Sequence, residues 1–110
     1  MTQPLAELVR EIAGGFPDAT ASSAPGAPGA GPAVATATWS RGGVAFAVLS
    51  STGIEIRLEP AVAAAASRTP DTAPSPRGRD WVRFRPRELD AHAIDRLRAW
   101  LDLAYRRTSG

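Results

Sequence analysis

The chain has 110 residues, the size of one domain with a modest hydrophobic core. It contains neither cysteine nor lysine, so disulfide bonds, thiolate metal ligands, cysteine nucleophiles and Schiff-base lysines are excluded. The 13 arginines and 11 acidic residues leave a formal net charge of only +2, which by itself is a weak indication of a nucleic-acid partner.

No segment approaches the roughly 20 consecutive apolar residues that a membrane helix needs. Residues 1–15 lack the basic start of a signal peptide and carry charges at Glu7, Arg10 and Glu11. We therefore expect a cytoplasmic protein with no membrane association.

Residues 1–15 predict an amphipathic helix. Its larger apolar residues recur at spacings of three and four, on one helix face: Leu5, Leu8, Val9 and Ile12. Pro4 suits the first turn of this helix, and Gly14-Gly15 suits its end. We expect the apolar face to dock on the protein's own domain, with docking on a partner as the alternative.

Residues 16–33 are predicted to be a flexible linker between this helix and the rest of the chain. They are rich in proline, alanine, glycine and serine, and Asp18 is their only charged residue. Such a segment buries too little apolar area to offset the entropy lost when a chain becomes ordered.

Three strands are predicted next, over residues 34–39, 44–49 and 54–58. The first and third alternate between apolar and polar residues, which is typical of strands with one buried face. The second is apolar on both faces, which is typical of a central, doubly covered strand. The short turns between them predict an antiparallel meander.

The second half of the chain predicts a short helix over residues 61–67, opened by Pro60, and then an irregular loop over residues 68–78. A fourth strand is expected over residues 81–85, with Val82 and Phe84 on one face. Asp90 is the expected N-cap of a long amphipathic helix that continues to about residue 107.

The expected fold is therefore α+β with two layers. A four-stranded antiparallel sheet, in the chain order βββαβα, packs on the long C-terminal helix and spans residues 34–107. The N-terminal helix is attached to this domain through the Pro/Ala/Gly-rich linker.

Several features together resemble one group of small bacterial proteins. They are the order of the elements, the strand over residues 46–49, the strand over residues 54–58 with Pro60 after it, Gly78 ahead of Trp81-Val82, and a final helix ending Leu101…Ala104-Tyr105. Over about Thr36 to Arg107 the chain resembles the MmcQ/YjbR-like family and the related "luciferase domain" proteins, a label that does not imply light emission.

This resemblance implies a compact α+β fold of the double-wing kind and a DNA-binding role, both by analogy of fold. Family members often carry a basic residue and a histidine just before the strand tryptophan. This chain has Arg79 and Asp80 there, and the acidic residue argues against phosphate binding at that spot.

The sequence gives little support to catalysis. The single histidine, His92, has no cysteine to join it as a metal ligand, and the acidic residues are dispersed. Ser50 and Ser51 lie in a turn without the GxSxG pattern, and no GxxxxGK[ST] loop is present. We therefore predict no catalytic, cofactor-binding or metal-binding residues, no cofactor and no enzymatic activity.

A cluster of arginines around the fourth strand is the one candidate site. Its members, with the aromatic residue among them, are Arg77, Arg79, Trp81, Arg83, Arg85 and Arg87. Arginine beside an aromatic ring suits phosphate contact and base stacking, so nucleic acid or another anion is a candidate partner. The interpretation that we favour for these residues is a solvated face on which Arg83 and Arg85 meet acidic residues of the neighbouring strand, Glu55 or Glu59, and Trp81 packs over arginine stems.

The preferred hypothesis is a small non-catalytic interaction domain that uses the sheet face opposite the C-terminal helix. A protein partner, a second copy of the chain, or the N-terminal helix as a removable cover would occupy that face. Nucleic-acid or anion binding through the arginine cluster is the first alternative, and an enzyme acting on a small molecule is the least favoured.

Overall fold

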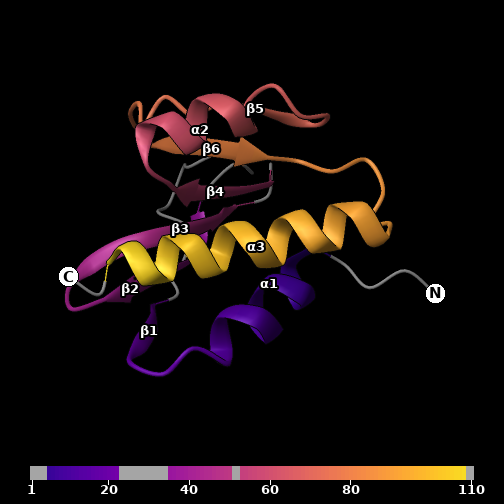
Figure 1. Ribbon diagram of the computed structural model, residues 1–110. Coiled ribbons are helices and arrows are strands. Elements are labelled where there is room, and N and C mark those ends of the chain that lie inside the picture. The colour runs from indigo at the N-terminus through magenta and orange to yellow at the C-terminus, as the bar shows by residue number, and fades with distance from the viewer. Residues whose placement is uncertain (1–4, 23–34, 51–52, 109–110) are drawn as a thin grey trace, which may run out of the picture.

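The structure, a computed structural model, describes residues 5–22, 35–50 and 53–108. Within these residues one antiparallel sheet of six strands forms, in the spatial order β1-β2-β3-β4-β6-β5 (Figure 1). The strands are β1 Ala19–Ser22, β2 Ala35–Arg41, β3 Val44–Ser50, β4 Gly53–Arg57, β5 Thr72–Pro74 and β6 Trp81–Phe84.

Three helices, α1 Leu5–Gly14, α2 Pro60–Ala66 and α3 Ala91–Arg107, contribute buried residues to one core together with the sheet. Helix α3 lies across the middle strands, α2 packs on β5 and β6, and α1 packs on α3 and β1 (Figure 1). We call the helix-covered side of the sheet the inner face and the opposite side the outer face. The expected two-layer α+β architecture is confirmed at this level.

Helix α3 begins where the sequence predicts. The Asp90 carboxylate accepts a hydrogen bond from the Ala93 backbone N–H at 2.8 Å, which is the N-cap interaction expected of that residue. The helix buries a stripe of residues against the sheet: Ala93, Leu97, Trp100, Leu101 and Ala104. This stripe fixes which strand residues belong to the core.

The strand register places the large apolar side chains on the inner face. Ile54 and Ile56 of β4 lie opposite Phe84 and Val82 of β6, and all four are fully buried. On β3, Leu49 and Ala47 continue the same rows toward β2. The alternation predicted for these strands therefore sets the core of the sheet.

Strand β3 departs from simple alternation at Phe46. Trp39 of β2 lies opposite Ala47, but the next residue, Ser40, lies opposite Ala45, so Phe46 is an extra residue in β3. This β-bulge lets consecutive side chains face the same way. Phe46 joins the inner core, fully buried, with its ring 6.1 Å from that of Tyr105 on α3. The apolar run predicted to be covered on both faces is thus explained in part by a bulge.

The expected four strands are too few, because β1 and β5 extend the sheet at its two edges. Both are short and contain only small residues and proline, so strand patterning gives a weak signal for them. Strand β5 lies in the segment predicted to be an irregular loop and ends at Pro74, a residue that sheets accept at an edge.

Strand β1 lies inside the segment predicted to be a linker. Residues Ala19–Ser22 pair with Trp39 and its neighbours on β2, so backbone hydrogen bonds order this part of the chain, and Ala19 packs against the core. Residues 23–33 of the predicted linker, and Ser51 in the predicted turn, lie outside the described residues.

Helix α1 belongs to the main core. Leu8, Val9 and Ala13 are buried in the same cluster as the sheet and α3. The stripe that docks it was predicted from the sequence. No helix in the described ranges combines the length and the apolar character needed to cross a membrane.

Candidate anion-binding site

Strand β6 divides the arginine-rich segment into a buried and an accessible part. Val82 and Phe84 are fully buried, and the Phe84 ring meets Trp100 edge to face with 5.2 Å between ring centroids. Trp81 and Arg83 alternate with them and are half-buried. Trp81, Arg83 and the arginines on either side of β6 are therefore the members of the predicted cluster that are accessible to a ligand.

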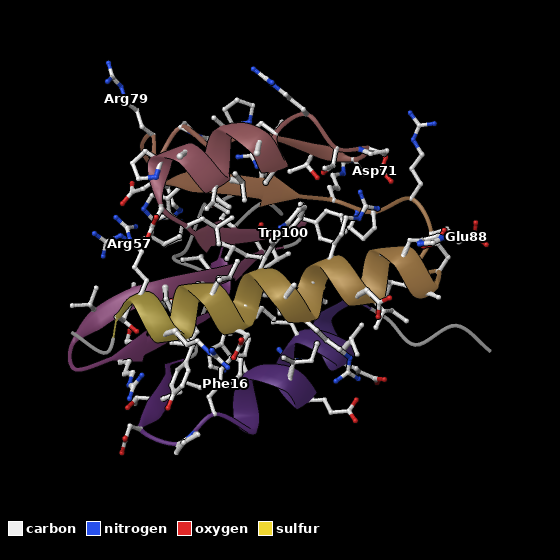
Figure 2. All side chains as sticks on the ribbon, viewed as in Figure 1. Phe16, Arg57, Asp71, Arg79, Glu88 and Trp100 are labelled. Atoms are coloured by element: carbon white, nitrogen blue, oxygen red, sulfur yellow. The ribbon has the colours of Figure 1, made fainter. Side chains whose placement is uncertain are left out.

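Asp80 is already occupied, by arginines from outside the predicted cluster. Its carboxylate accepts hydrogen bonds from Arg57 at 2.8 Å and from Arg107 at 3.2 Å. The hydrogen bond from Arg57 holds the pKa of Asp80 below its ordinary value of 3.8, against the opposing effect of partial burial. Asp80 therefore does not neutralise its sequence neighbour Arg79, whose side chain projects into solvent (Figure 2).

Glu55 is occupied as well, by Arg77 and Ser75. Arg77 donates to one carboxylate oxygen at 3.0 Å, and the Ser75 hydroxyl donates to the other. The Arg77 guanidinium also lies over the Trp81 ring, 5.6 Å from its centroid. Arg77 is thus a structural member of the cluster, holding the segment before β6 against β4.

Arg83 does not pair with Glu55, although the two residues lie directly opposite each other on β6 and β4. Its Nε is buried and has no hydrogen-bond partner. Within the described residues no ion pair of Arg83 or Arg85 is found, and Glu59 is exposed at the start of α2. The predicted cross-strand pairing of these arginines with acidic residues is therefore wrong, because Arg77 takes the Glu55 carboxylate.

Three of the predicted residues share one surface depression of about 600 Å³, which we call the arginine hollow. It is lined by Asp71, Thr72, Ala73, Arg83, Arg85 and Arg87. Asp71 is its only acidic residue and lies 3.6 Å from Arg87, whose side chain is 93% exposed. The hollow therefore has an excess of positive charge, which suits an anion.

A second depression, of about 380 Å³, lies beside Trp81, and we call it the tryptophan hollow. It is lined by Pro60, Ala63, Ala64, Ser67, Pro74, Gly78, Arg79 and Trp81. Helix α2 supplies one wall with small side chains, which keep the helix thin and the depression open. Its lining is mainly apolar, with one guanidinium and one aromatic ring.

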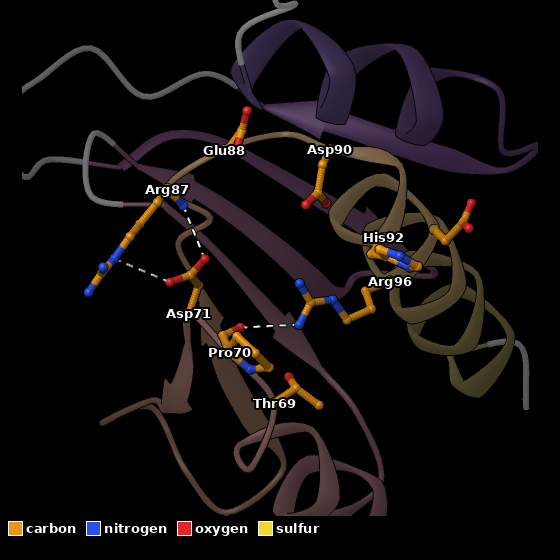
Figure 3. A pocket seen from close by; sticks show the side chains of 9 residues that line it. Thr69, Pro70, Asp71, Arg87, Glu88, Asp90, His92 and Arg96 are labelled. Carbon is orange, nitrogen blue, oxygen red and sulfur yellow. Dashed lines mark hydrogen bonds and ion pairs between the residues drawn. The ribbon is translucent and has the colours of Figure 1, made fainter.

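A third depression, of about 650 Å³, lies at the start of α3 (Figure 3). It contains His92 together with four acidic residues and two arginines. Arg96 donates to the Pro70 carbonyl at 3.2 Å, and Asp90 is engaged as the N-cap. In the part of the chain that the structure describes, no three histidine or acidic side chains come together as metal ligands. The mixed charge gives this depression no clear preference for a ligand.

Sequence reasoning found the arginines of the site but missed the wall opposite them. That wall is β5, together with Asp71 in front of it. The sequence carries a signal for the turns before the edge strands, namely the pairs Pro17-Asp18 and Pro70-Asp71. In the structure each pair stands between a helix and an edge strand, and the two aspartates have positive φ angles of 64° and 62°. Aspartate tolerates this backbone conformation better than most residues, so a Pro-Asp pair marks a turn.

Comparison of the chain with protein-family models, with curated proteins and with solved structures finds no match.

Proposed function

We propose that the protein is a non-catalytic binding domain that takes a phosphate-bearing anion in the arginine hollow. The observation that carries this proposal is that Arg83, Arg85 and Arg87 line one surface depression in which Asp71 is the only acidic residue.

The charge around Arg83 supports the same function. Arg85 lines the hollow without an acidic partner in the described residues, and the ion pair of Arg87 is long and solvent-exposed. The arginine guanidinium presents a planar set of donors that matches the oxygens of a phosphate group. Three such groups around one depression would hold a multiply charged anion better than a singly charged one.

The outer sheet face receives less support as an apolar interaction surface. Among the described residues the exposed large hydrophobic side chains are Val44, at the start of β3, and Leu103, on α3. Neither belongs to a continuous apolar patch in the middle of the outer face, and α1 packs on α3 instead of on that face. Anion binding is therefore the function that we favour.

Membership of the MmcQ/YjbR-like family is a further proposal. The order of the elements from β2 to α3 supports it, as does the two-layer α+β architecture. The proposed anion binding does not depend on this membership, because it rests on the arginines of the hollow.

Isothermal titration calorimetry with inorganic tripolyphosphate tests the proposed function. We expect the Arg83→Glu, Arg85→Glu double variant to bind at least about tenfold more weakly than the wild type, because each lost charge-assisted hydrogen bond is worth about 1.5–3 kcal/mol. The wild-type affinity should also fall as salt is raised, since both partners are charged.

The matched control is Arg10→Glu, Arg98→Glu, which makes the same change in net charge at two exposed helix positions away from the hollow. It should retain most of the affinity. Equal losses in the two double variants would show that only overall charge matters, and undetectable binding to the wild type at low salt would reject the proposal outright. Circular dichroism of each variant verifies that it is folded.

A further inference from the structure

The arginine hollow and the tryptophan hollow are neighbours along the same two strands. Thr72 and Ala73 of β5 line the first, and the next residue, Pro74, lines the second. On β6 the order is the same, with Arg83 in the first and Trp81 in the second. The two hollows therefore follow each other along the β5–β6 ladder, in which Pro74 lies opposite Val82.

The chemistry of the two hollows is complementary. The arginine hollow is cationic, whereas the tryptophan hollow is mainly apolar and has an aromatic ring in its wall. Trp81 and Arg83 are two residues apart on β6, a span of about 6.7 Å, and alternation gives their side chains the same side of the strand. This spacing would allow one ligand to contact both. Such a ligand has a flat apolar group beside an anionic one.

Trp81 is placed to stack on such a flat group. Its side chain is half-buried and lines the hollow, and the Arg77 guanidinium, held by Glu55, lies against the ring. This support fixes the orientation of the ring before a ligand arrives. A pre-oriented aromatic ring next to cations is the arrangement by which proteins hold the bases of single-stranded nucleic acid.

We propose that the two hollows together bind a nucleotide unit, with its base against Trp81 and its phosphate among Arg83, Arg85 and Arg87. Arg79, exposed at the rim of the tryptophan hollow, contacts the phosphate on the other side of that base when the unit is part of a strand. The inference rests on the proposed anion binding and names the class of the anion. Base stacking on one ring is tolerant of sequence, so little base preference is expected.

Fluorescence anisotropy with a labelled, mixed-sequence single-stranded oligonucleotide tests the inference. An abasic phosphodiester strand of the same length is the control on the ligand side, because it keeps the charge and lacks the bases. We expect the abasic strand to bind the wild type about tenfold more weakly. Trp81→Ala should weaken binding of the oligonucleotide by a similar factor while binding of inorganic tripolyphosphate stays unchanged.

Tryptophan fluorescence gives a second readout that does not depend on a truncated side chain. Trp39 and Trp100 are 3% and 8% exposed, so a bound base can reach only the half-buried Trp81. Binding of the oligonucleotide should quench the wild-type emission. Trp81→Phe keeps an aromatic ring, so it should retain the affinity and lose the quenching.

The outcomes separate the two proposals. If tripolyphosphate binds through Arg83 and Arg85 but the abasic strand binds as tightly as the oligonucleotide, the nucleotide inference fails and the anion-binding function stands. Quenching that persists in Trp81→Phe also overturns the inference. A nucleoside monophosphate that quenches Trp81 and reaches the affinity of the strand supports the shared site and identifies a free nucleotide as its source.

Discussion

Asp80 joins three parts of the chain that are far apart in sequence. Its carboxylate holds Arg57 at the end of β4 and Arg107 at the end of α3. Its backbone carbonyl accepts a hydrogen bond from the Leu58 N–H at 2.6 Å, and Arg107 donates to the Leu58 carbonyl at 2.9 Å. This one residue ties the sheet to the C-terminal end of α3.

The position of Asp80 gives stability a defined dependence on pH. Because the hydrogen bond from Arg57 lowers the pKa of Asp80 in the folded protein, the folded state binds this proton more weakly than the unfolded state does. The contribution of Asp80 is therefore complete above the unfolded pKa, near 3.8, and is lost as the pH falls through the lower folded value.

We expect Asp80→Asn to lower the free energy of unfolding by about 1–2 kcal/mol at neutral pH, since it removes two partly exposed ion pairs and leaves their hydrogen bonds weaker. Urea denaturation of wild type and variant, at neutral pH and at several values below pH 4, measures this. The difference between them should shrink as the pH falls. A difference that grows as the pH falls would contradict the role given to Asp80. The control is Asp102→Asn, which removes an exposed i,i+4 ion pair with Arg106 and should change the free energy of unfolding by about 0.5 kcal/mol or less.

The partners of the arginines were the least predictable feature of the site. The sequence correctly identifies β6 as the strand that carries them, because the alternation of Val82 and Phe84 is local. It cannot rank the possible ion pairs, because Glu55 meets Arg77 from 22 residues away and Asp80 meets Arg107 from 27 residues away. Such pairing depends on how the loop before β6 folds back on β4, which no local pattern encodes.

At the scale of elements, the two edges of the sheet are built alike. Helices α1 and α2 each end in a turn that contains a Pro-Asp pair and leads into an edge strand. Arg85 donates its backbone N–H to the Asp71 carbonyl at 2.9 Å, so this turn also positions the start of the arginine hollow. The central strands were predicted because their large apolar residues either alternate or form a continuous run, whereas the edge strands were missed because they are short and contain only small residues and proline.

Gly53, the first residue of β4, has the least room for a side chain among the glycines that the structure describes. Its φ angle is +137°, and a Cβ atom there would lie 2.7 Å from the Phe84 carbonyl oxygen on β6. Only glycine fits this close approach of two strands without a shift of the backbone.

We expect Gly53→Ala to destabilise the protein by about 2–4 kcal/mol, because backbone strain adds to the steric clash. The control is Gly42→Ala in the turn between β2 and β3, where φ is +59° and nothing lies within 4 Å of the added Cβ. That change should cost only about 1 kcal/mol. Thermal unfolding followed by circular dichroism compares the stability of the two variants. If Gly53→Ala lost no more stability than Gly42→Ala, the backbone of β6 would have to shift at little cost, against this prediction.

At the scale of the whole molecule, aromatic contacts close the core at the end near β1. The Phe16 ring lies just after α1 (Figure 2) and stacks on Tyr105 of α3 with 4.5 Å between centroids. The Arg41 guanidinium lies 4.1 Å from the centroid of the Tyr105 ring. The Tyr105 hydroxyl donates to the Pro17 carbonyl. These contacts hold the chain after α1 in place, so that β1 can pair with β2.

The sequence predicts which side of α1 is buried but not what it is buried against. The apolar stripe at Leu5, Leu8, Val9 and Ile12 is a local property of the helix. Its docking surface is formed by α3 and β1, and β1 is a strand of four small residues that its sequence indicates only weakly. The packing of α1 therefore does not support the hypothesis that this helix is a removable cover for the outer face. Its buried residues belong to the core.

Truncation of one α1 side chain measures how far the fold depends on this helix. Leu8 is 3% exposed, so Leu8→Ala should lower the free energy of unfolding by about 2–4 kcal/mol, through lost apolar burial and the cavity left behind. Arg10→Ala, on the exposed side of the same helix, should change it by about 0.5 kcal/mol or less. Urea denaturation measures both. If α1 were a detachable cover, Leu8→Ala would leave the main unfolding transition unchanged, whereas an integral α1 makes the loss appear in a single cooperative transition.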